Sequence, residues 1–125
     1  MYTVRYRHSM NLLDITWTGL ITPADMIHYI DDCRLCWRRE GIRDGYRERI
    51  VFSDDQPLPQ GTLAIHAGAF TGFPVPSRTA MVTKSAIARM QIRRTMPKAQ
   101  LEIFDTPEAA LNWLMEADFP PRNSG

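Results

Sequence analysis

The sequence predicts an α/β domain with a single, mostly parallel sheet of about five strands, an antiparallel N-terminal strand and about four helices. Three observations lead to this prediction. A chain of 125 residues has the length of one domain. Short β-rich runs alternate with segments of helical periodicity, which favours parallel strands joined by crossover helices. A Thr followed by a Pro, a signal for the start of a helix, occurs at Thr22 and again at Thr106.

The chain begins with a predicted β-hairpin. Apolar and polar side chains alternate from Tyr2 to Arg7 and again from Leu13 to Thr18, which is the period of half-exposed strands. Polar residues around Ser9 to Asn11 separate the two runs. We expect the first strand to lie at an edge of the sheet.

A first helix is predicted between Thr22 and about Arg39. Pro23 suits the first helical position, and Gly41 ends the helix. Apolar side chains recur at spacings of four, three and four residues and form one stripe, which consists of Met26, Ile30, Cys33 and Trp37.

The middle of the chain contains two predicted strands on either side of a stretch rich in Pro and Gly. The strands are expected at Arg49–Phe52 and Ser77–Thr83. Between them only Thr62–Phe70 favours a helix, because prolines and glycines interrupt the rest of residues 56–76.

The C-terminal part predicts a helix, a strand and a last helix. Ser85–Arg94 is expected to be helical, with Ile87 and Met90 facing inward. A short strand, Leu101–Phe104, precedes the last helix, whose Trp113 we expect to anchor it to the sheet.

Composition and charge limit the class of the protein. We assign residues 1–117 to one domain and residues 118–125 to a disordered tail, since the tail holds nothing that could pack. The net charge of +1 creates no field that would collect nucleic acid. No apolar run approaches the roughly 20 residues of a membrane-spanning helix, and the first residues lack the apolar segment of a signal peptide. We therefore expect a cytoplasmic protein without membrane insertion.

Two segments carry a resemblance to a known family, namely Ser85–Met90 at the start of the penultimate helix and Ile103–Leu114, which ends in Ala-Leu-Asn-Trp-Leu. Together with the order of elements, they resemble the bacterial STAS-like proteins of the SpoIIAA-like fold over nearly the whole chain. The resemblance implies a fold. The sporulation regulators that name this fold carry a phosphorylated serine in an Asp-Ser-Ser-Gly-like motif just after the third strand. Here Ser53-Asp54-Asp55-Gln56-Pro57 stands at that place, so the phosphorylatable serine motif is missing.

The cysteines are the most visible candidates for chemistry. Cys33 and Cys36 form a CxxC pair well inside the first predicted helix. A redox pair needs a helix N-terminus, and a structural zinc site needs further ligands, so we interpret both as core residues, with a redox or metal role as the alternative. The sequence has neither a Gly-x-Ser-x-Gly nucleophile elbow nor a phosphate-binding loop. We therefore predict no catalytic residue, no metal and no cofactor, and a protein that is not an enzyme.

The carboxyl ends of the parallel strands are the expected ligand site, because ligands of α/β sheets bind in the crevice there. The candidate ligand-binding residues are Asp54, Thr83, Lys84, Ser85 and Arg89. The amide end of the following helix and the two bases favour an anion. In the alternative, structural interpretation, Ser85 and Thr106 cap helices and the charges are solvated.

Two further groups of side chains are candidates for contact with partners. The first is a basic cluster of Arg89, Arg93, Arg94 and Lys98, which is either a solvated helix face or a partner patch. The second covers one face of the sheet or forms a homodimer contact, and it consists of Phe70, Phe73, Pro74, Val75 and Pro76. We expect a non-enzymatic STAS-like binding or regulatory module that acts through protein–protein contacts and forms a homodimer. The alternative function is binding of a small anionic or lipid ligand at the carboxyl ends of the parallel strands.

Overall fold

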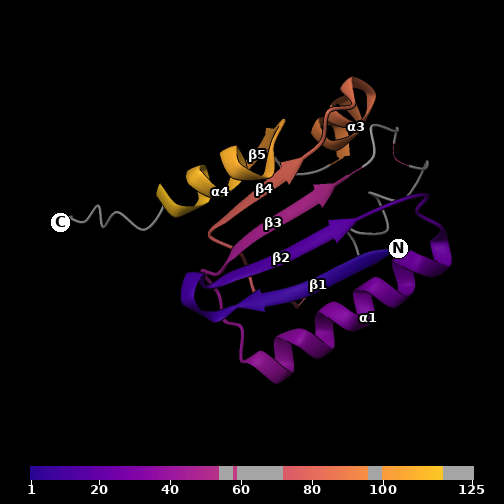
Figure 1. Cartoon of the computed structure of the whole chain (residues 1–125). Helices are drawn as coiled ribbons and strands as arrows, with labels where there is room; N and C mark the ends of the chain where they lie inside the picture. The colour runs from indigo at the N-terminus through magenta and orange to yellow at the C-terminus, as the bar shows by residue number, and fades with distance from the viewer. Residues whose placement is uncertain (54–57, 59–71, 96–99, 117–125) are drawn as a thin grey trace.

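The structure, a computed structural model, describes residues 1–53, 58, 72–95 and 100–116 (Figure 1). Its elements are, in chain order, β1 (Tyr2–Arg7), the 3₁₀ helix η1 (His8–Met10), β2 (Leu12–Trp17), α1 (Pro23–Glu40), β3 (Arg47–Phe52), β4 (Arg78–Val82), α3 (Ala86–Thr95), β5 (Leu101–Phe104) and α4 (Pro107–Glu116). This order confirms the predicted α/β class. The described residues hold three α-helices, and the helix predicted at Thr62–Phe70 and the tail predicted at 118–125 lie outside them.

The five strands form one mixed sheet in the consecutive order β1-β2-β3-β4-β5. β1 pairs antiparallel with β2, as the hairpin prediction required, and the later pairs are parallel. The register aligns a row of apolar side chains across β2 to β5, made of Ile15, Ile50, Met81 and Ile103. Among the described strands β1 and β5 are therefore the two edges, and the carboxyl ends of β2 to β5 lie along one side of the sheet.

Side chains alternate between the two faces of the sheet, and each face has its own core. The larger core packs the buried faces of α1 and α3 against that aligned apolar row. The smaller core packs Ala110 and Leu114 of α4 against Leu12, Ala80 and Val82. Helix α1 contacts β1 at one edge, whereas α4 contacts β3, β4 and β5, so the two helices cover different parts of the sheet (Figure 1).

Helix α1 begins and ends where the sequence predicts. The Thr22 hydroxyl accepts a 3.1 Å hydrogen bond from the amide of Asp25, and the Asp25 carboxylate accepts one of 3.2 Å from the amide of Thr22. Gly41 ends the helix with φ of +68°, a conformation that a glycine adopts without strain. Neither α1 nor any other helix among the described residues is long and apolar enough to cross a membrane.

Helix α3 presents a different face to the core than the sequence predicts. Ile87 and Met90, expected inside, are 56% and 58% exposed, while Ala88 and Ile92 are fully buried. The Ser85 hydroxyl accepts the amide of Ala88 at 3.1 Å and so sets the phase of the first turn. Ala88 and Ile92 stand four residues apart and form an equally good helical stripe, and only contact with the sheet decides between the two stripes.

Arginines of the sheet hold α4 at both of its ends. Arg49 donates to the Pro107 carbonyl at 3.0 Å, near the start of the helix. Arg47 donates to the Leu114 carbonyl at 3.1 Å and Arg78 to the Trp113 carbonyl at 2.7 Å, near its end. The carbonyls of Trp113 and Leu114 belong to the last turn of the helix, where main-chain carbonyls lack partners inside the helix. The guanidinium groups of Arg47 and Arg78 therefore act as the C-terminal cap of α4.

Trp113 contacts the sheet, as predicted, but from the margin of the smaller core. Its ring lies 5.6 Å from that of Phe104, between centroids, and the guanidinium carbon of Arg78 lies 4.4 Å from the indole centroid. Trp113 is half-buried, whereas Ala110 and Leu114 are fully buried. The side chains that anchor α4 in the smaller core are therefore those of Ala110 and Leu114.

Candidate functional site

Three of the five residues predicted to bind a ligand meet at the carboxyl end of β4. Thr83 is buried, and its hydroxyl accepts a hydrogen bond of 3.1 Å from the amide of Ser85. The Ser85 hydroxyl is the cap of α3, and Arg89 donates to the Thr83 carbonyl at 3.5 Å. Each hydroxyl thus bonds to the protein's own main chain rather than pointing toward a ligand.

The charged members of this group do not converge on a common point. The Arg89 guanidinium is paired with the Asp105 carboxylate, which follows β5. Lys84 is exposed, and Asp54 lies outside the described residues. On α4, the Thr106 hydroxyl accepts the amide of Ala109 at 3.1 Å, the capping role that the structural interpretation assigned to it. The geometry of this cluster therefore favours the structural interpretation over an anion site.

The two cysteines lie in the interior. Cys33 is fully buried and Cys36 is 2% exposed, and both are free thiols. Burial raises the pKa of each thiol above its ordinary value, which disfavours the thiolate needed for redox chemistry or metal binding. Among the described residues, no group of three or more His, Cys, Asp and Glu side chains could hold a metal ion.

The apolar segment predicted to cover the sheet or to form a dimer contact is divided between the interior and the surface. Phe73 is 8% exposed and its ring lies 5.2 Å from that of Trp37, so it belongs to the larger core. Val75 is 65% exposed. Phe70 lies outside the described residues. Phe73 therefore fulfils the first of the two predicted roles.

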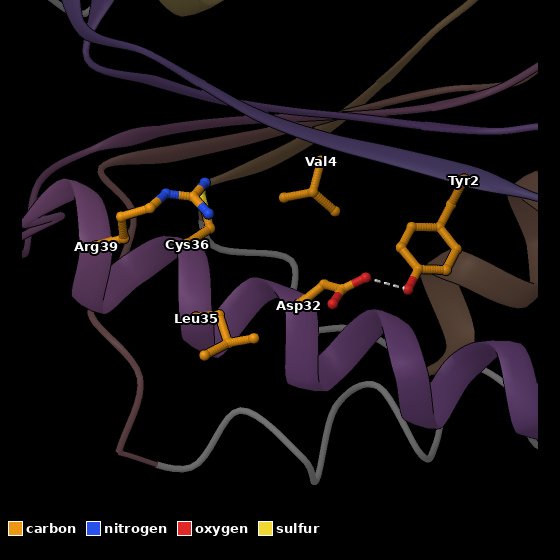
Figure 2. Close-up of a pocket in the computed structure, with 6 residues that line it drawn as sticks. All are labelled: Tyr2, Val4, Asp32, Leu35, Cys36 and Arg39. Carbon is orange, nitrogen blue, oxygen red and sulfur yellow. Dashed lines mark hydrogen bonds between the residues drawn. The ribbon is translucent and has the colours of Figure 1, made fainter.

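A pocket of about 220 Å³ lies between β1 and α1, at the edge of the sheet. It is lined by Tyr2, Val4, Asp32, Leu35, Cys36 and Arg39. Figure 2 shows Tyr2 and Val4 extending from β1 toward α1, where the Tyr2 hydroxyl donates to the Asp32 carboxylate. Leu35 is 58% exposed although it is a large apolar residue. We call this pocket, with the outer edge of β1 beside it, the edge groove.

The main chain of β1 offers hydrogen-bonding groups along the edge groove. Met1 and Thr18 exchange main-chain hydrogen bonds of 2.9 and 2.8 Å, which marks them as a hydrogen-bonded pair of the antiparallel ladder. Such pairs alternate along a ladder, so Thr3, Arg5 and Arg7 bond to β2. The peptide groups of the intervening residues, Tyr2, Val4 and Tyr6, point away from the sheet.

The sequence predicted the edge position of β1 but not the groove. The missed signal is the pair formed by the exposed Leu35 and the strand residue Val4, which are 31 positions apart in the printed chain. Nothing local links them, because the groove exists only once α1 packs beside the edge strand.

One acidic side chain, Glu48, lies on a covered face of the sheet rather than at the surface. It stands on the face of β3 that α1 covers, and its carboxylate accepts a 3.1 Å hydrogen bond from the Thr79 hydroxyl. Burial raises the pKa of Glu48 to about 7. The thiol of Cys33 and the hydroxyls of Tyr29 and Tyr46 lie close enough to Glu48 for its charge to raise their pKa values. All three side chains are buried and held protonated, so we assign Glu48 a role in stability rather than in chemistry.

Comparison of the chain with known protein families and curated proteins identifies no relative. No protein-family model matches the chain, and no curated protein matches it. The function is therefore inferred from two sites. One is the edge groove, and the other is the group of Thr83, Ser85 and Arg89 at the carboxyl end of β4, which we call the strand-end cluster.

Proposed function

We propose that this protein is a non-enzymatic, STAS-like binding or regulatory module of the bacterial cytoplasm, which acts through protein–protein contacts at the edge groove. The observation that carries the proposal is the outer edge of β1, which pairs with no other strand among the described residues, beside a pocket that α1 lines. The order of strands and helices, on which the STAS resemblance depends, supports the family assignment.

The exposed edge of a sheet can bind another protein by β-strand addition. An extended segment of a partner adds a strand, and its main chain bonds to the outward peptide groups while alternate side chains enter the adjacent pocket. Tyr2, Val4 and Tyr6 supply such groups on β1. The pocket of about 220 Å³ suits one or two side chains, because small-molecule sites have about 300–1,000 Å³.

The strand-end cluster supports the non-enzymatic part of the proposal. Thr83, Ser85 and Arg89 are engaged with the main chain and with Asp105, and the engaged groups leave no nucleophile paired with a base among them. An anionic or lipid ligand at this site would first have to displace the Arg89–Asp105 pair.

A peptide selection with a structural readout tests the proposal. A random peptide library is displayed against the immobilised protein, and bound peptides are titrated into labelled protein and followed by amide NMR shifts. We expect selected peptides to shift residues of β1 and of α1 from Asp32 to Arg39, and to lose binding when Val4→Pro removes one outward donor. Peptides that instead shift residues 83–89 would contradict the groove assignment.

A parallel titration addresses the alternative function. Inorganic phosphate and a short fatty acid are added to the same labelled protein. Saturable shifts at Thr83, Lys84, Ser85 and Arg89, without shifts in β1, would favour the anion or lipid binder. Arg89→Gln is the matched variant for that site, because it removes the charge and keeps most of the side chain.

A further inference from the structure

We propose that the occupant of the edge groove is a second copy of this chain, with the two β1 strands paired antiparallel across a two-fold axis at Val4. This inference rests on the proposed function of the edge groove and names its partner. The arrangement would join the two sheets into one continuous sheet and pair the β1 edge of each copy, with β5 left at the two outer edges.

The outward peptide groups of β1 are arranged symmetrically for such pairing. Val4 is the middle one of the three residues whose peptide groups point outward, with Tyr2 and Tyr6 at equal spacing on either side. A two-fold axis at Val4 pairs it with the second copy's Val4, and pairs Tyr2 with the second copy's Tyr6. Each of these pairs is of the hydrogen-bonded kind, so the outward donors and acceptors are satisfied together.

Charge on the opposite face of β1 disfavours one neighbouring register. With the axis at Val4, Arg5 lies directly opposite the second copy's Thr3. A shift of the axis to Arg5 would place two arginines directly opposite each other, which is destabilising. Pairing over the whole strand is possible because β1 forms a regular six-residue strand, Tyr2–Arg7, without proline.

Helix α1 carries a matching, self-complementary pattern. Asp32 and Arg39 both line the groove and stand seven residues apart, roughly 10 Å along the helix axis. Leu35 lies between them (Figure 2). In the single chain the Asp32 carboxylate accepts from the Tyr2 hydroxyl, and Arg39 pairs with Glu40 at 3.0 Å, but both side chains remain exposed. A two-fold axis near Leu35 brings Asp32 of each copy toward Arg39 of the other, so that two further pairs of opposite charge form at once.

The centres of the strand pattern and the helix pattern lie at the same pocket. Val4, the middle one of the three outward-facing residues of β1, and Leu35, near the middle of the charged pair, line the same pocket. One axis through the groove therefore satisfies the main chain of β1 and the charges of α1 together. It also covers Leu35, which is 58% exposed in the single chain. An unrelated peptide would satisfy the edge of β1, but it would not use the symmetric placement of Asp32 and Arg39 about the groove.

A charge-swap series measured by sedimentation equilibrium tests the inference. The wild-type chain is studied from micromolar to millimolar concentration, and we expect a monomer–dimer equilibrium. Asp32→Arg or Arg39→Asp alone places like charges opposite each other and should raise the dimer dissociation constant at least roughly tenfold. The double swap Asp32→Arg with Arg39→Asp restores opposite charges and should return the dissociation constant toward the wild-type value.

The chain offers matched controls. Asp31 and Arg38 have the same seven-residue spacing and are exposed, but do not line the groove, so their swap should leave the dimer unchanged. Leu35→Glu places two like charges at the axis and is safe for folding, since the side chain is already exposed. It should weaken the dimer at least as much as a single swap, with an unchanged thermal midpoint at concentrations where the chain is monomeric.

The outcomes separate this inference from the proposed function. A wild-type chain that stays monomeric at millimolar concentration would overturn the second copy as occupant. A dimer that Val4→Pro and Leu35→Glu leave intact would overturn it too, as would a folded double swap that fails to restore dimerisation. In each of these cases, selected peptides that shift β1 and α1 would still uphold the edge groove as a protein-binding site.

Discussion

Thr79 and Glu48 are register partners on β4 and β3, and the Thr79 hydroxyl donates a 3.1 Å hydrogen bond to the Glu48 carboxylate on the face that α1 covers. Burial raises the pKa of this carboxyl from 4.5 to about 7, and the hydrogen bond from Thr79 opposes the rise without cancelling it. The folded protein therefore keeps a proton on Glu48 in a range of pH where the unfolded chain releases it.

The first prediction concerns the pH dependence of stability. Because the folded pKa is the higher one, the native state binds more protons, and the Glu48 contribution to the free energy of unfolding falls as pH rises from about 4.5 to about 7. The loss amounts to about 3 kcal/mol, at 1.36 kcal/mol per unit of pKa. Glu48→Gln should remove this dependence and stabilise the protein at pH values above 7.

Urea denaturation of the wild type and of Glu48→Gln at several pH values measures the difference. Glu102→Gln, on an exposed side chain of β5, is the control and should follow the wild type. Parallel pH profiles for wild type and Glu48→Gln would show that the carboxyl is solvated.

The second prediction compares two neighbouring side chains of α4. Leu114 is fully buried in the smaller core, so Leu114→Ala should lower the free energy of unfolding by about 2–5 kcal/mol. Trp113 is half-buried over Arg78, so Trp113→Ala should cost less, about 1–2 kcal/mol from lost area and the cation–π contact. Denaturant midpoints measure both, and a larger loss for Trp113→Ala would mean that the indole, not Leu114, holds the helix.

The third prediction tests the assignment of the outer edge of β1 in the single chain. The Val4 amide points outward, so Val4→Pro removes no bond to β2, and it should cost only about 1 kcal/mol, from lost packing of the half-buried Val4 side chain against the larger core. Arg5→Pro removes an inward donor and should cost about 2 kcal/mol or more. Both are measured by urea denaturation at low protein concentration. Equal losses for the two variants would contradict the alternation derived from the Met1–Thr18 pair.

The fourth prediction concerns the thiols. Cys33 is fully buried and Cys36 lines the edge groove at 2% exposure. With both pKa values raised by burial, the native protein should react slowly with a thiol-specific disulfide reagent, Cys36 before Cys33, and rapidly in urea. Absorbance of the released thiolate gives the rates. A native Cys33 rate equal to that of the unfolded chain would refute the core assignment.

Local features of the fold could be predicted because their causes are local. The hydroxyl of Thr22 and the φ of Gly41 act within one turn, so they set the ends of α1 before any tertiary contact forms. The alternation in β1 likewise predicted a half-exposed strand, and its pairing with β2 confirms the hairpin.

In the strand-end cluster, the sequence predicts which residues lie together but not which atoms their side chains contact. The sequence placed Thr83, Ser85 and Arg89 near one another, and the structure agrees with that placement. It could not tell whether their polar atoms face a ligand or the main chain. Asp105, sixteen residues beyond Arg89, forms an ion pair with its guanidinium, and that contact depends on the pairing of β4 with β5.

What the sequence alone determined is therefore the class of the fold, the identity of most elements and the ends of α1, since periodicity and capping act over a few residues. Only the tertiary structure decided which face of α3 is buried, that burial raises the pKa of Glu48, and that a groove opens between β1 and α1. Each of these depends on contacts between segments distant in the chain. Helical or strand periodicity tells which side chains share a face, but only packing tells which face meets the core.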